Sequence, residues 1–156
     1  MPNITSEQLK GLFNSGHAFA KPQHILADLS GESAATIPAG ALHCIASHVA
    51  HMAWWQRQAL HHIETRATQW QRLEGDEFPL EIAALEWDAI RRDFFESLEA
   101  LRALCDDEAT LERGYVSGRN SIAYVLVDHA LHNGYHMGQI VLLRRSLGVW
   151  TPEFNS

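Results

Sequence analysis

Cysteine is scarce in this sequence. Cys44 and Cys105 are the only two in 156 residues, and they do not form a Cys-x-x-Cys motif. This scarcity argues against a disulfide framework and against a cysteine-rich zinc site. We interpret both as small core residues. Because Cys44 lies four residues before His48 on one predicted helix, a thiolate ligand beside that histidine stays open as an alternative.

Long apolar runs and basic charge are also lacking. No stretch of about 18 apolar residues occurs, and residues 1–5 lack the basic and apolar regions of a signal peptide, so we expect a soluble, cytoplasmic protein. Lys and Arg number 12 against 19 Asp and Glu, which gives a formal net charge of -7. Nucleic acids and anionic membranes bind basic surfaces, so we expect neither as a partner.

The apolar residues recur with helical spacing, and strand alternation is missing. The length fits a single domain over residues 1–156, and the pattern predicts an all-α fold. The first helix is predicted to be broken, with pieces over about 6–14 and 22–30, and the others to cover about 41–65, 79–104 and 121–148. Ser121 or Asn120 fits the N-cap of the last helix, and Arg144 and Arg145 lie in its last turns, where the helix dipole favours cations.

Three histidines interrupt the apolar stripe of this last predicted helix: His129, His132 and His136. Side chains four residues apart lie on one face of a helix, so His132 and His136 can converge on a single ion. Burying an imidazole without a partner costs about 1–3 kcal/mol. Any one of the three could be a core histidine bonded to the backbone or to a tyrosine, but three together favour a metal site inside a helix bundle.

His48 borders the apolar stripe of the second predicted helix and is available as a ligand from a second direction. Three neutral imidazoles suit a divalent transition metal better than magnesium or calcium. We expect zinc or nickel, with iron, manganese or copper as alternatives. The Glu-x-x-His motif of carboxylate-bridged di-iron bundles is absent. Nearby, we interpret His61 and His62 as solvated, and Trp54 and Trp55 as packing or interface residues.

The run from His132 to Trp150, HNGYHMGQIVLLRRSLGVW, resembles the C-terminal signature of the DinB-like superfamily. That signature reads H-x-x-[YH]-H-x-G-Q-I, followed by L-R and a terminal G-x-W. Upstream, Ser47-His48-Val49 is similar to the histidine segment of the family's second helix, and Gly16-His17-Ala18 is similar to a weaker element of some members.

The resemblance implies an up-down-down-up four-helix bundle that is often a homodimer. It also implies a divalent metal held by His48, His132 and His136. His51 and His129 are extra relative to the family pattern, and either could support the site or replace His48 as a ligand.

Related families include metal-dependent thiol transferases that use low-molecular-weight thiols. The resemblance therefore implies a metal-dependent enzyme with thiol S-transferase or hydrolase chemistry on a small-molecule substrate. His17, His51 and His129 are the candidates for catalytic proton transfer. The alternative is a non-catalytic metal-binding module, acting in a stress response or as a dimerising partner. An open cleft beside the histidines would favour catalysis, whereas a fourth protein ligand would favour the structural alternative.

Overall fold

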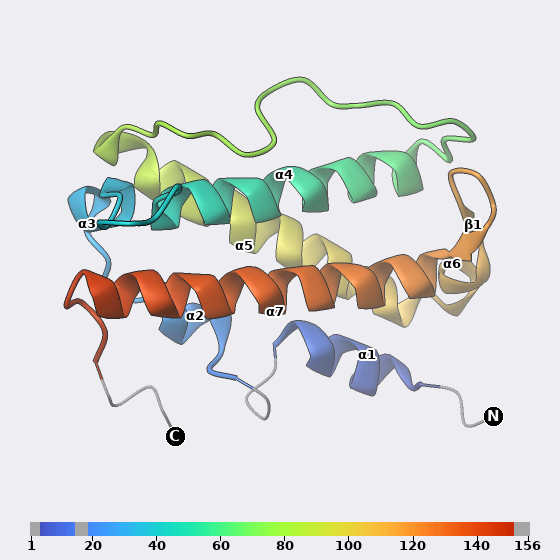
Figure 1. Cartoon of the computed structure of the whole chain (residues 1–156). Coiled ribbons are helices and arrows are strands. Elements are labelled where there is room, and N and C mark those ends of the chain that lie inside the picture. The colour runs from blue at the N-terminus through green and yellow to red at the C-terminus, as the bar shows by residue number, and fades with distance from the viewer. Residues whose placement is uncertain (1–3, 15–18, 152–156) are drawn as a thin grey trace.

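The computed structural model describes residues 4–14 and 19–151, which form an all-α bundle (Figure 1). Its principal helices are α1 (Ser6–Phe13), α4 (Ile45–Glu64), α5 (Trp87–Ala103) and α7 (Ile122–Ser146). Helices α1 and α7 run in one direction, and α4 and α5 run in the other, as the up-down-down-up topology requires. Because α4 and α5 are parallel, residues 65–83 return along the bundle as a long crossover.

The core forms where the apolar stripes of the helices meet. On α5 the buried positions include Trp87, Phe94, Leu98 and Leu101, spaced by seven, four and three residues, which is the spacing of one helix face. Burying side chains of this size contributes roughly 1.5–3 kcal/mol each to the hydrophobic driving force. In the described part of the chain, no helix is long and apolar enough to cross a bilayer.

Short elements link the long helices. They are α2 (Pro22–Ile25), α3 (Gly31–Ala35), the 3-10 turns η1 (Ala84–Glu86) and η2 (Leu104–Asp106), α6 (Glu108–Glu112), and the strands β1 (Gly114–Tyr115) and β2 (Asn120–Ser121). The two strands form an antiparallel hairpin, which the sequence does not predict because two residues are too few to show alternation. Ser121 then caps α7, as predicted: its hydroxyl accepts the Tyr124 N–H at 3.2 Å.

Two predicted helix starts are too early. Helix α4 begins at Ile45 rather than near residue 41, because Cys44 has an extended backbone and its Sγ accepts the Ser47 N–H at 3.4 Å. Helix α5 begins at Trp87 rather than near residue 79, because residues 79–83 belong to the crossover and Ala84–Glu86 form the 3-10 turn η1. The Trp87 indole donates to the Leu29 carbonyl at 3.0 Å. This bond holds the first residue of α5 to the segment that precedes α3.

The second piece of the first helix is also shorter than predicted. Helix α2 is a single turn, and Asp28 soon after it has a φ of 54°, in a region where a helix cannot continue. The carbonyls at this helix end are bound by Arg144 of α7, which is 1% exposed. Its guanidinium donates to Ile25 O at 2.6 Å, Ala27 O at 3.0 Å and Val149 O at 2.7 Å. Arg144 therefore ties three parts of the chain together, a role beyond the dipole interaction expected from the sequence.

Candidate metal centre

The histidines of α4 and α7 meet where these two antiparallel helices pack together. Nε2 of His132 lies 3.1 Å from Nε2 of His51 and 3.1 Å from Nε2 of His136. One ligand nitrogen from each ring lies within 4.8 Å of the other two. Nitrogens bound to a common ion at about 2.0–2.1 Å are roughly 3.0–3.4 Å apart. The group of His51, His132 and His136 could therefore hold a metal ion.

Hydrogen bonds on the far side of two of these rings set their orientation. Nδ1 of His51 is 2.6 Å from the Glu77 carbonyl. Because a carbonyl only accepts, His51 carries its proton on Nδ1 and keeps the Nε2 lone pair toward His132. Nδ1 of His136 is 2.9 Å from Nδ1 of His48, so one ring donates to the other. With His136 as the donor, its Nε2 lone pair also faces His132.

Burial keeps these rings neutral. Loss of hydration lowers the pKa of His48, His132 and His136 to about 4, and it also lowers the pKa of His51. Neighbouring imidazoles lower the pKa further, because a protonated ring would repel a second protonated ring beside it. At pH 7 the rings are therefore in the neutral form that binds metals.

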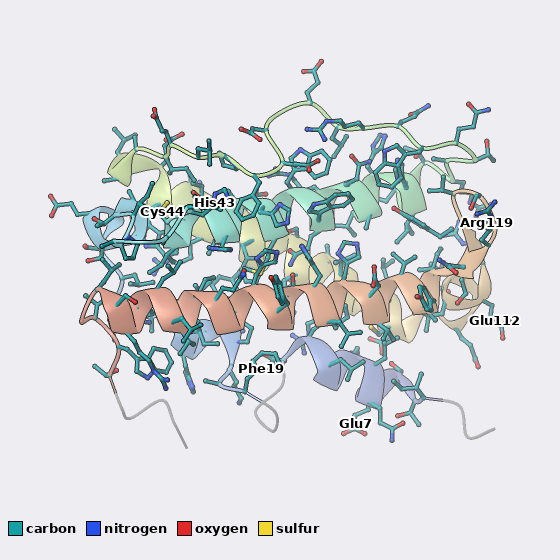
Figure 2. All side chains as sticks on the ribbon, in the orientation of Figure 1. Glu7, Phe19, His43, Cys44, Glu112 and Arg119 are labelled. Atoms are coloured by element: carbon teal, nitrogen blue, oxygen red, sulfur yellow. The ribbon has the colours of Figure 1, made fainter. Side chains whose placement is uncertain are left out.

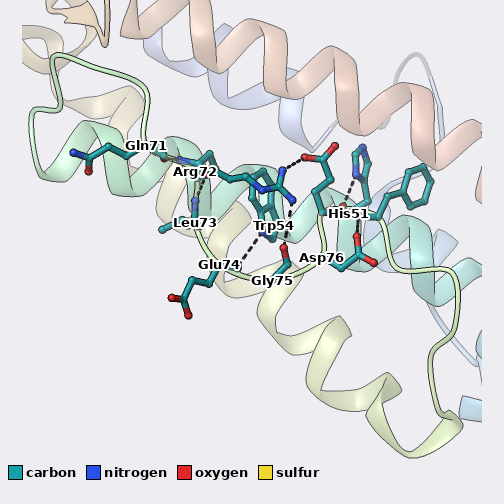
Figure 3. Close-up of polar contacts among 11 residues, drawn as sticks. His51, Trp54, Gln71, Arg72, Leu73, Glu74, Gly75 and Asp76 are labelled. Carbon is teal, nitrogen blue, oxygen red and sulfur yellow. Dashed lines mark hydrogen bonds and ion pairs between the residues drawn. The ribbon is translucent and has the colours of Figure 1, made fainter.

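The crossover forms one wall of the site, and contacts with α4 hold it there (Figure 3). The Trp54 indole donates to the Glu74 carbonyl at 3.3 Å, and Arg72 lies over the Trp54 ring while pairing with the Glu77 carboxylate. Beyond Glu77, the Phe78 ring stacks on His51 with their centroids 4.3 Å apart. This wall covers the His51 ring and supplies its hydrogen-bond acceptor.

His62 belongs to the same attachment of the crossover, and the prediction that it is solvated is wrong. It is 1% exposed. Its Nδ1 lies 3.0 Å from the Tyr115 hydroxyl, and its Nε2 lies 2.9 Å from the backbone oxygen of Gln71. The error arises because its sequence neighbours are polar, while the chain that buries it comes from the crossover and the hairpin.

The residues predicted for the site occupy different positions in the structure. His48 lies behind His136, and among the described residues the group that can share one ion contains His51 instead. His129 is 9% exposed, and its Nδ1 has no partner in the described part of the chain. His17 lies outside the described residues. Cys44, at the start of α4 (Figure 2), uses its Sγ to cap that helix and is not part of the histidine group.

An open cleft of about 730 Å³ borders the histidines. His51, His129 and His132 line it together with five aromatic side chains, those of Trp55, Trp70, Tyr115, Tyr124 and Tyr135. Trp54 is buried, in keeping with its expected packing role, whereas Trp55 reaches the cleft. The sequence does not show this aromatic wall, because its members come from α4, the crossover, the hairpin and α7.

A family model described as the DinB superfamily matches residues 19–140. The chain belongs to the DinB superfamily. The matched range includes His51, His132 and His136 and ends within α7. Comparison with curated proteins and with solved structures gives no significant match. For this DinB-superfamily protein, membership and the three-histidine group are both compatible with metal binding.

The burial of His129 should make the free energy of unfolding of this DinB-superfamily protein depend on pH. Burial lowers its pKa from 6.5 to about 4, so between these values the unfolded chain binds a proton that the folded chain does not. Stability is therefore lost as the pH falls through this window. In urea unfolding of chelator-treated protein, His129→Gln should reduce the pH dependence by up to about 1.4 kcal/mol per unit. Equal slopes for the two proteins between pH 6.5 and 4.5 would contradict this prediction.

Proposed function

We propose that this protein is a metal-dependent enzyme that uses a divalent transition metal on three histidines to act on a small molecule. The observation that carries the proposal is the convergence of three neutral imidazoles at the edge of an open cleft. No carboxylate or cysteine in the described part of the chain joins this group as a fourth ligand. Three protein ligands and access from a cleft are the features of a catalytic metal site, whereas structural sites are closed by a fourth ligand.

The ligands in this proposal are His132, His136 and His51. His51 is chosen because its Nε2 faces the nitrogens of α7, while its Nδ1–H is fixed by the Glu77 carbonyl. His48, the ligand implied by the family resemblance, is proposed to hold His136 through the Nδ1 contact. Zinc and nickel are the metals that we expect first, since the donor set consists of imidazoles.

A divalent metal with an open coordination position lowers the pKa of a bound thiol or water and polarises an electrophile. The protein's own residues bind and orient the substrate and transfer its proton. His129 lines the cleft one helical turn from His132 and is the proposed proton acceptor. The Phe78 ring stacks on His51 and contacts the edge of His48, so it packs directly against the histidine group.

The experiment is a panel of thiols tested with electrophilic acceptors, using protein reconstituted with zinc or nickel and chelator-treated protein. The panel includes anionic glutathione, neutral 2-mercaptoethanol and cationic cysteamine. We expect metal-dependent turnover with at least one thiol, and an approximately tenfold or greater loss in His129→Gln. Hydrolysis of activated esters without added thiol tests the hydrolase alternative in the same assay. Absence of metal-dependent turnover in both assays would favour the non-catalytic metal-binding module.

A further inference from the structure

The cleft beside the histidine group is lined by aromatic and acidic side chains. The thirteen residues that line it include no lysine or arginine. Two of them are acidic, Glu77 and Asp128. The Glu77 carboxylate is neutralised by Arg72, but Asp128 has no hydrogen bond or ion pair in the described part of the chain. The cleft therefore presents one uncompensated carboxylate.

The aromatic side chains around this carboxylate have accessible faces. Trp70 is 50% exposed, Tyr124 is 58% exposed and Tyr135 is 65% exposed. The rings of Trp55 and Trp70 lie 5.9 Å apart at an angle of 40°, so they form a corner rather than a closed stack. Exposed aromatic side chains gathered in one cleft are a feature of ligand-binding grooves.

On α7, Asp128 lies between two of these rings. Tyr124 precedes it by four residues and Tyr135 follows it by seven, so all three lie on one helix face. His132 follows Asp128 by four residues, which span about 6 Å along the helix axis. Aromatic faces around a carboxylate attract organic cations, because the ring quadrupole and the negative charge act in the same direction.

We propose that this cleft binds a small substrate carrying a positively charged amine or quaternary ammonium group, placed against Asp128 and the aromatic rings. The cationic nitrogen would then lie roughly 6 Å along the α7 axis from the group that reaches His132. This proposal adds a substrate class to the proposed function and rests on it, because the substrate in this cleft is taken to react at the metal site. It also predicts that a carboxylate-rich thiol such as glutathione binds weakly, because no basic side chain lines the cleft.

The test compares three probes of nearly equal shape: choline, neutral 3,3-dimethylbutan-1-ol and anionic 3,3-dimethylbutanoate. Their binding is followed by tryptophan fluorescence and ligand-observed NMR at low ionic strength, where charge interactions are least screened. Choline is expected to bind about tenfold more tightly than the neutral probe, and the anion more weakly still. Asp128→Asn should bring choline to within about threefold of the neutral probe, and Trp70→Leu should weaken choline binding as well.

Glu96→Gln is the matched control, because it removes one exposed carboxylate of α5 and changes the net charge equally. It should retain the preference for choline. Equal binding of choline and the neutral probe, or equal losses in Asp128→Asn and Glu96→Gln, would overturn the proposal. All titrations are run on zinc-loaded and on metal-free protein. A preference for choline in both forms, together with no turnover in the thiol and ester assays, would overturn only the proposed enzyme activity.

Discussion

Replacing His132 or His136 with alanine is expected to abolish stoichiometric metal binding. Each substitution removes one of three converging nitrogens, and two imidazoles bind a divalent ion far more weakly than three. Untagged protein is incubated with zinc, dialysed and analysed by elemental mass spectrometry. The wild-type chain should retain about one ion, and the two variants close to none. His61→Ala, at the far end of α4, should retain the wild-type content.

The same measurement distinguishes the two candidates for the third ligand. If His51 binds the ion, His51→Ala should match the loss in His132→Ala. His48→Ala, which removes only the contact behind His136, should weaken affinity by about 10–100-fold. The reverse order of effects would assign the third position to His48, as the family resemblance implies. Full metal content in the His132→Ala, His136→Ala double variant would exclude the site altogether.

The second large effect is expected at Arg144. Arg144→Ala should lower the free energy of unfolding by about 3 kcal/mol or more, because it leaves carbonyls of Ile25, Ala27 and Val149 without their donor. Each buried polar group that loses its partner costs about 1–3 kcal/mol. The substitution also leaves a cavity in the space of a side chain that is 1% exposed. Urea unfolding followed by circular dichroism measures the change.

The neighbouring arginine provides the control for this prediction. Arg145 is exposed and its guanidinium lies 6.0 Å from the Trp150 ring, so Arg145→Ala should cost no more than about 1 kcal/mol. Arg144→Lys keeps the charge but replaces a planar fork by a single ammonium group, which cannot reach both Ile25 and Val149. Its stability should fall between those of the wild type and Arg144→Ala. Equal stabilities for Arg144→Ala and Arg145→Ala would show that the carbonyls find other donors.

Local sequence features predict the helices and part of the site. The spacing of His132 and His136 places both rings on one face of α7 whatever surrounds it, because four residues complete about one helical turn. Ser121 marks the start of α7 for an equally local reason, since its hydroxyl binds an N–H three residues on. The family signature carried the same information and extended it to the up-down-down-up topology. The predicted homodimer and the substrate stay predictions.

Only the packing of α4 against α7 decides which histidine of α4 joins the pair. His48 and His51 are three residues apart and share a face, so the sequence pattern suits either one. A shift of α4 along α7 by about 4.5 Å would exchange their positions. The crossover, the burial of His62 and the aromatic cleft with Asp128 likewise depend on segments far apart in the chain. By itself the sequence determined the four long helices, apart from the starts of α4 and α5, and the His132–His136 pair, because these arise within single helices. The tertiary structure decided which residues of α4 and of the crossover face this pair, because their positions depend on how the helices pack.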